Sequence, residues 1–184
     1  MIISNKLVKS NSVATNIVIA IGSSFLLALL ARLSLPVPFS PVPITGQTFG
    51  VLLLGGLLGS RLAALSIFLY LVEGIIGLPV FAGGSLGILY LFGPTGGYLI
   101  GFIPAAFLIG YLIENGWNKK LSLIIASMTI GTTVIFLFGI SWLALTAGIN
   151  TSIQIGLMPY LPGAAIKITL ASIFVYTVNR LSKQ

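Results

Sequence analysis

The run ITGQTFGVLLLGGLLGSRLAALSIFLYLVEGIIG, residues 44–77, consists of two apolar segments on either side of the turn Gly59-Ser60-Arg61. Within the segments 44–58 and 62–77 the only charged side chain is Glu73. A membrane with a hydrocarbon core about 30 Å thick is crossed by helices of about 20 apolar residues. Two apolar segments joined by a short cationic turn therefore predict a pair of membrane helices, with the turn at a water-facing surface.

The same pattern extends outward from this pair to both ends of the chain. Hydrophobic residues make up 57% of the 184 residues and charged residues 6%, whereas soluble proteins have about 25% charged residues. Four further apolar segments are residues 13–31, 95–113, 121–147 and 159–178. We therefore predict an all-α integral membrane protein with six transmembrane helices, in which residues 1–184 form a single membrane domain.

The positive charges predict the orientation of these helices. Three connections carry no cation, namely residues 35–43, 78–94 and 148–158. Seven cations lie in the N-terminal segment 1–12, in the other turns or at the C-terminus: Lys6, Lys9, Arg61, Lys119, Lys120, Arg180 and Lys183. Because cytoplasmic loops are enriched in Lys and Arg, we expect both termini in the cytoplasm, the uncharged connections outside, and a multi-pass protein of the cell membrane.

The composition excludes several classes of function. The chain has no Cys, His or Asp, and its only carboxylates are Glu73 and Glu114. A catalytic dyad, a Ser-His relay or a metal cage cannot be built from these residues, and no GxxxxGK[ST] loop is present. We therefore predict no enzyme activity, metal or cofactor. The net charge of +7 follows from the cytoplasmic cations, so we expect no binding of nucleic acid.

The uncharged outer connections are the expected place for a ligand. Their prolines and glycines give irregular backbone, which near a membrane requires cover from protein or water. Thr45, Gln47 and Thr48 follow the proline-rich connection 35–43. Their side chains offer hydrogen bonds in an otherwise apolar pocket, although helix capping and contacts between helices are equally available roles.

Lys167 is the second feature that indicates a ligand. It follows Pro159 by eight residues, about 12 Å along a helix, and an ammonium inside hydrocarbon is costly unless it is paired or hydrated. The functional interpretation is a contact with a ligand carboxylate or carbonyl. The alternatives are that the side chain extends to the outer surface or pairs with Glu73, for which Arg32 is the competing partner.

A stripe of small residues marks one face of the segment 13–31. Ala20, Ser24 and Ala28 are four residues apart, a spacing that permits close approach of another membrane helix. The partner helix belongs either to this chain or to another protein. From the residues alone, packing within the chain is the favoured alternative.

Four motifs in matching order resemble the BioY family. They are SPVPITGQTFGVLLLGGLLG at residues 40–59, YLVEGIIGLPVFAGG at 70–84, GPTGGYLIGF at 93–102 and PYLPGAAIK at 159–167. BioY proteins are biotin-binding S-components of energy-coupling factor (ECF) transporters. The resemblance implies a six-helix bundle, high-affinity biotin uptake, and partners in the form of a transmembrane coupling protein and two ABC-type ATPases. It also implies that Ala20, Ser24 and Ala28 dock on the coupling protein.

The resemblance carries the ligand site to particular positions. The implied ligand-binding residues are Thr45, Gln47, Gly83, Gly84, Tyr90, Tyr98, Ala164 and Lys167, and Phe39 is a further candidate wall or loop-packing residue. The family motif has an Asp three residues before its Lys, and here that position is Ala164. An acid there would neutralise Lys167 and accept hydrogen bonds from a cyclic urea, so we expect weaker biotin binding than in relatives.

Other functions remain open on the residues alone. An S-component for another vitamin has the same composition, and only the motifs favour biotin. A stand-alone facilitator or channel is the alternative from a different class, but it predicts a continuous polar stripe along several helices, whereas the polar residues here gather toward the outer ends. A membrane enzyme would be indicated by turnover of a substrate by the purified chain.

Overall fold

The computed structural model describes residues 13–182. The predicted cytoplasmic segment 1–12, with Lys6 and Lys9, and also Lys183 lie outside the described residues. The described part is almost entirely helical. Its long helices are α2 (Val13–Arg32), α3 (Gln47–Leu58), α4 (Ser60–Ile75), α6 (Gly96–Glu114), α7 (Leu121–Ala147) and α9 (Leu161–Leu181).

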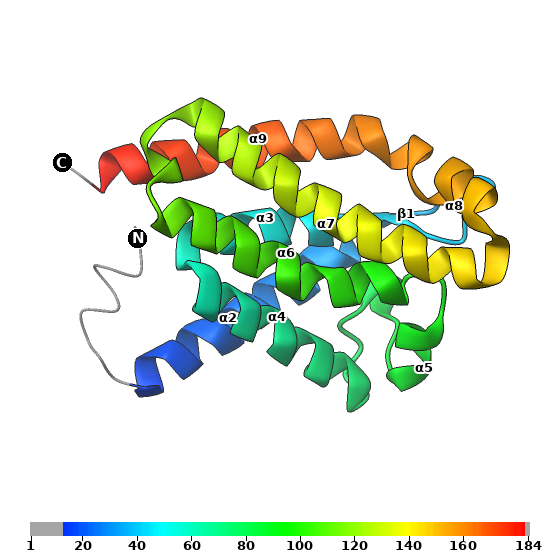
Figure 1. Cartoon of the computed structure of the whole chain (residues 1–184). Coiled ribbons are helices and arrows are strands. Elements are labelled where there is room, and N and C mark those ends of the chain that lie inside the picture. Colours follow the sequence, from blue (N-terminus) through cyan, green and yellow to red (C-terminus); the bar gives the residue numbers. More distant parts are fainter. Residues whose placement is uncertain (1–12, 183–184) are drawn as a thin grey trace.

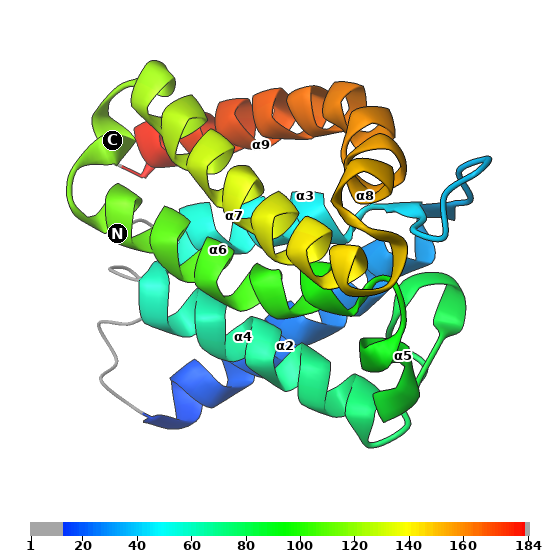
Figure 2. The same cartoon turned by 45° about the vertical axis from the view of Figure 1, so that its right-hand side comes forward.

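The long helices run along one common direction and form a bundle with two distinct ends (Figure 1). The start of α2, the turn between α3 and α4, the turn between α6 and α7, and the end of α9 lie at one end. The connections between α2 and α3, α4 and α6, and α7 and α9 lie at the opposite end, which the second view also shows (Figure 2). The cations Arg61, Lys119, Lys120 and Arg180 thus belong to one end of the bundle. The structure therefore confirms that the cation-bearing turns lie at one end of the bundle and the uncharged connections at the other.

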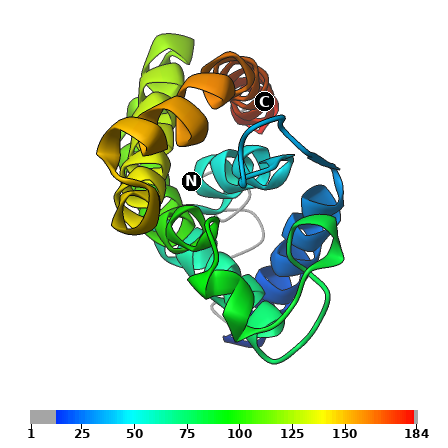
Figure 3. The ribbon, with the colours of Figure 1, turned by 90° about the vertical axis from the view of Figure 1, so that its right-hand side faces the viewer.

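Helix α3 is the centre of the bundle. It contacts each of the other five long helices, and the view along the bundle places it inside the ring that they form (Figure 3). Gly55 and Gly56 allow this, because a Cβ at Gly55 would lie 3.0 Å from the carbonyl oxygen of Ala106, and one at Gly56 would lie 2.7 Å from a methyl group of Val175. The position of α3 therefore depends on small residues that let α6 and α9 approach its backbone.

The uncharged connections contain short elements of their own. The connection 35–43 joins β1 (Ser34–Leu35) to β2 (Ile44–Thr45), which pair as an antiparallel hairpin. The connection 78–94 contains η1 (Ala82–Gly84) and α5 (Ile88–Phe92). The prediction of a loop over 148–158 is wrong, because α8 (Ile149–Gly156) and η3 (Met158–Tyr160) occupy it. Residues 149–156 contain no proline, so nothing in them interrupts helical hydrogen bonding. The remaining short element, η2 (Trp117–Lys119), lies between α6 and α7.

Four helical segments of the described chain are long and apolar enough to cross a membrane. They are Val13–Arg32, Gly96–Glu114, Leu121–Ala147 and the joined segment Ile149–Leu181. Helix α3 has 12 residues, which corresponds to about 18 Å, less than the hydrocarbon thickness. Such a short helix is tolerated at the centre of a bundle because protein, rather than lipid, covers the backbone at its ends.

The small-residue stripe of α2 packs inside the chain. Ala20 and Ser24 are both 0% exposed, and the Ser24 hydroxyl donates a 2.7 Å hydrogen bond to a carboxylate oxygen of Glu73 in α4. Ala28 is only partly exposed. Ala20 and Ser24 therefore take part in packing between helices of this chain. The hydrogen-bond partner of Glu73 is thus the Ser24 hydroxyl, and not Lys167 or Arg32, the two cations considered from the sequence.

A carboxylate secures the turn between α3 and α4. Glu114, the last residue of α6, accepts hydrogen bonds from the backbone N–H of Ser60, at 3.0 Å, and from the Ser60 hydroxyl, at 2.7 Å. Gly110 makes the approach possible, because a Cβ there would overlap the backbone of Gly59 and Ser60. A negative charge at a helix N-terminus satisfies free N–H groups and interacts favourably with the helix dipole.

We expect the Glu114→Gln variant to unfold at a lower temperature than the parent protein. The amide removes the charge at the N-terminus of α4, and for an exposed carboxylate this interaction is worth about 0.5–1 kcal/mol. Thermal unfolding in detergent measures the effect, with Ser60→Ala and the double variant measured in parallel. Because both changes break one contact, their effects should not add; full additivity would contradict the assignment.

Candidate ligand-binding cavity

A cavity lies between the hairpin and the parts of α3, α6, α7 and α9 near the hairpin end of the bundle. Its volume is about 70 Å³. Most of the wall is apolar, and Leu52, Leu99, Phe102, Ile135 and Phe136 contribute to it. The polar lining residues are Thr45, Gln47, Thr48, Tyr90, Thr95, Tyr98, Thr132, Tyr160 and Lys167. An apolar wall with a few polar groups is typical of small-molecule sites.

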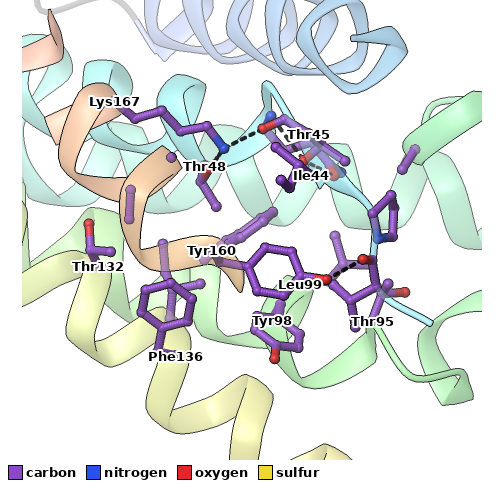
Figure 4. Close-up of a pocket in the computed structure, with 18 of the residues that line it drawn as sticks. Ile44, Thr45, Thr48, Thr95, Tyr98, Leu99, Thr132, Phe136, Tyr160 and Lys167 are labelled. Carbon is purple, nitrogen blue, oxygen red and sulfur yellow. Dashed lines mark hydrogen bonds between the residues drawn. The ribbon is translucent and has the colours of Figure 1, made fainter. Parts of the chain in front are cut away.

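Lys167 joins α9 to the beginning of α3 (Figure 4). Its ammonium donates a 2.7 Å hydrogen bond to the backbone carbonyl of Thr45 and a 2.8 Å hydrogen bond to the hydroxyl of Thr48. Both acceptors are neutral, so the positive charge is hydrogen-bonded but not neutralised. Among the described residues that line the cavity, Lys167 is the one charged side chain.

Thr45 and Gln47 hold each other in place in the lining of the cavity. The Thr45 hydroxyl donates to the Gln47 side-chain oxygen at 2.9 Å and accepts from the Gln47 backbone N–H at 3.3 Å. The Gln47 side-chain nitrogen donates to the Tyr70 hydroxyl at 2.6 Å. Thr45 and Gln47 are 9% and 4% exposed. The sequence Thr-Gly-Gln at the start of α3 therefore places two bonded polar side chains on the cavity wall.

Tyrosine side chains form another part of the cavity wall. The Tyr98 hydroxyl donates to the backbone carbonyl of Gly156 at 2.8 Å, and a Cβ at Gly139 would overlap the Tyr98 ring. Tyr90 stacks on Phe81, with ring centroids 5.1 Å apart. Burial raises the pKa of the Tyr90 hydroxyl, an effect that the hydroxyls of Thr95 and Ser85 partly oppose. Tyr90 is therefore a neutral wall residue at physiological pH.

Ser40 and Tyr160 attach the hairpin to the connection between α7 and α9. The Ser40 hydroxyl donates to the backbone carbonyl of Ile155 at 2.8 Å and lies 2.7 Å from the Tyr160 hydroxyl. The Tyr160 hydroxyl also donates to the backbone carbonyl of Val42, as the close-up shows (Figure 4). These bonds hold the two connections together above the cavity.

Most of the predicted ligand-binding residues meet at this cavity. Those that line it are Thr45, Gln47, Tyr90, Tyr98, Ala164 and Lys167. Gly83 and Gly84 do not line the cavity, whereas the adjacent Ala82 does. A Cβ at Gly84 would lie 2.6 Å from the Arg32 guanidinium, whereas one at Gly83 would meet nothing within 4 Å. Both glycines have a positive φ, as the turn requires, and Gly84 lies against Arg32. The Arg32 guanidinium also donates a 2.8 Å hydrogen bond to the carbonyl of Pro79.

Phe39 is not a wall of the cavity. It is 96% exposed at the hairpin and has a positive φ of 65°. Conversely, sequence reasoning gave no ligand-site role to Thr132, Tyr160 or Tyr70, which line or support the cavity. Thr132 and Tyr70 lie inside apolar segments, and only their inward orientation on α7 and α4 distinguishes them from packing residues.

The cavity is equipped to bind and not to carry out covalent chemistry. Its charged group is a cation, and its other polar groups are hydroxyls and one amide. The volume of about 70 Å³ is smaller than the ~300–1,000 Å³ typical of ligand pockets.

Comparison with known proteins agrees with this architecture. The model of the BioY family matches residues 4–184. The biotin transporter BioY of Rhizobium etli is 39% identical over 155 residues, covering 80% of this chain and 82% of that protein. The probable biotin transporter BioY of Pyrococcus horikoshii is 40% identical over 137 residues, covering 74% and 80%.

The fold is also similar to a crystal structure of the S-component for biotin from an ECF-type ABC transporter. The TM-score is 0.78 with 30% sequence identity, and the match covers 93% of this chain and 92% of that one. The family match extends over nearly the whole sequence. The chain therefore belongs to the BioY family.

Proposed function

We propose that this protein is the biotin-binding, substrate-specific subunit of an ECF-type vitamin uptake transporter. The observation that carries the proposal is the outer cavity, in which a single ammonium faces an apolar and aromatic wall, in a chain whose relatives are named biotin transporters. Biotin combines an apolar tail and bicycle with a carboxylate and a urea carbonyl. A cation and a few hydrogen-bonding groups in an apolar cavity suit such a molecule.

Lys167 is the proposed anchor of the ligand. Its ammonium has three N–H groups, of which two are used by Thr45 and Thr48. No further acceptor bonds this ammonium among the described residues, so its third N–H can bind a ligand oxygen. A carboxylate or a carbonyl would gain a charge-assisted hydrogen bond in a partly buried site, where such bonds are stronger than in water.

We further propose that uptake is energised by a transmembrane coupling protein and two ABC-type ATPases. The chain has no GxxxxGK[ST] loop, so ATP hydrolysis by that route must come from other subunits. Ala20 and Ser24 are buried, and of the stripe only Ala28 is partly exposed. Docking through α2 in this arrangement would therefore involve Ala28 and the exposed apolar side chains of that helix.

The proposed topology has six membrane-crossing helices with both termini in the cytoplasm. The distribution of the cations supports it, because Arg61, Lys119, Lys120 and Arg180 belong to the end of the bundle opposite the cavity. Cytoplasmic connections are enriched in Lys and Arg. The cavity then opens toward the outside.

We expect the detergent-purified protein to bind biotin saturably in titration calorimetry, and the Lys167→Met variant to bind it about one to two decades more weakly. Loss of a charged hydrogen bond costs about 1.5–3 kcal/mol. Lys120→Met is the matched control, because Lys120 is exposed in the turn before α7. Absence of binding by the folded parent protein would overturn the assignment of biotin and direct the same titration to other vitamins.

Ala164 provides a second test of the site. An acid at this position would lie on the cavity wall, one helical turn from Lys167. We expect Ala164→Asp to tighten biotin binding by about one to two decades, because the carboxylate adds a charged acceptor for the urea N–H groups. Ala164→Asn, of similar shape but neutral, should gain less. Unchanged affinity in both variants would exclude position 164 from the site.

The chain has no cysteine, so labelling of the purified single-cysteine variants after the reaction has no background from the chain itself. We expect a membrane-impermeant maleimide, added to intact cells, to label Asn150→Cys in α8 but not Lys120→Cys in the turn between α6 and α7. Both side chains are exposed, so reactivity depends on the side of the membrane. Permeabilised cells provide the control for Lys120→Cys, and the opposite labelling pattern would reverse the proposed orientation.

A further inference from the structure

Tyr70 is a buried residue of α4 that does not line the cavity but contacts residues that do. Its side chain is 0% exposed. The hydroxyl bonds to Gln47 and to the backbone of Val80, and the ring meets the ring of Phe81 edge-on. We infer that Tyr70 is a positioning residue that orients the Gln47 amide, so that Gln47 offers the ligand a hydrogen-bond donor and not an acceptor.

The direction of each hydrogen bond follows from one carbonyl. The Val80 oxygen can only accept, so the Tyr70 hydroxyl must donate its single proton there, at 2.9 Å. The Tyr70 oxygen then accepts from the Gln47 side-chain nitrogen at 2.6 Å. The Gln47 oxygen is consequently on the other side, where it accepts from the Thr45 hydroxyl at 2.9 Å.

The reversed amide would not satisfy the same groups. It would place the Gln47 oxygen against the Tyr70 hydroxyl, whose one proton cannot serve both that oxygen and Val80. The Thr45 hydroxyl would at the same time face N–H groups and lose its acceptor. Because unpaired buried polar groups are costly, the three bonded side chains hold a single orientation of the amide.

The ring of Tyr70 supports the cavity wall by a second route. Tyr70 and Phe81 pack at 80° with centroids 5.6 Å apart, and Phe81 stacks on the wall residue Tyr90 at 16° and 5.1 Å. Gly74 makes room for this arrangement, because a Cβ there would overlap the Phe81 ring. Through its hydroxyl, Tyr70 thus joins Val80 in the connection 78–94 to the lining residue Gln47. Through its ring it supports the lining residue Tyr90 by way of Phe81.

The consequence concerns the chemical class of the ligand. With its oxygen bonded to Thr45, the Gln47 amide retains one N–H without a partner among the described residues. Lys167 is also a donor. Gln47 and Lys167 therefore both favour ligands that present hydrogen-bond acceptors, namely carbonyl or carboxylate oxygens. This inference rests on the proposed function, in that biotin supplies such oxygens.

A double-mutant cycle with biotin tests the role of Tyr70. Tyr70→Phe keeps the ring and removes the hydroxyl, so we expect biotin affinity to fall about five- to tenfold, the size of one hydrogen bond. In a Gln47→Ala background the same change should have little further effect, because Tyr70 acts through Gln47. Tyr176→Phe, which loses the bond to Arg180 near the end of α9, is the matched control and should bind like the parent. No loss in Tyr70→Phe, or an equal loss in both backgrounds, would overturn the inference.

A second measurement does not depend on biotin. The chain has three glutamines, Gln47, Gln154 and Gln184, so labelling with ¹⁵N-glutamine gives few side-chain amide signals, and Gln47→Ala identifies those of Gln47. We expect Tyr70→Phe to shift the Gln47 amide signals and to speed their hydrogen exchange. Unchanged signals would overturn the inference even if biotin binds. A parent protein that fails to bind biotin but shows the expected shift would overturn only the proposed function.

Discussion

The bond between Lys167 and the start of α3 is the interaction on which the cavity depends. An ammonium within an apolar bundle must be hydrogen-bonded or hydrated, and here the carbonyl of Thr45 and the hydroxyl of Thr48 supply acceptors. The pair brings α9 to the end of α3 where the hairpin arrives. Because both acceptors are neutral, the positive charge remains available to a ligand, and one contact serves both the fold and the proposed recognition.

Helix α3, to which Lys167 is bonded, contacts all the other long helices of the bundle. It is short and mostly buried. Gly55 and Gly56 allow the neighbouring helices close approach, while Gln47 links it through Tyr70 to the segment around Val80. At the other end, Glu114 secures the turn that leaves α3. The bundle is held by polar contacts at its two ends and by tight apolar packing between them.

The two carboxylates of the chain both have structural roles in this arrangement. Glu73 accepts a hydrogen bond from Ser24 and joins α4 to α2, and Glu114 binds the N-terminus of α4. Neither belongs to the cavity lining. This leaves Lys167 as a cation bonded only to neutral acceptors, which is the electrostatic basis for expecting that an acid at Ala164 would change ligand affinity.

The sequence by itself determined the membrane class, the approximate helices and the two ends of the bundle, because long apolar segments and the positions of cations depend only on local composition. It also singled out Thr45, Gln47 and Lys167, since polar side chains in apolar surroundings stand out, and the resemblance to the BioY family added Tyr98; all four line the cavity. Only the tertiary structure decided that Gly84 faces Arg32, that Ser24 bonds to Glu73, and that residues 149–156 form a helix. It alone connected Tyr70 to Gln47, 23 residues away. Such contacts depend on which faces of distant helices meet, and nearly uniform apolar segments carry no periodic signal for that choice.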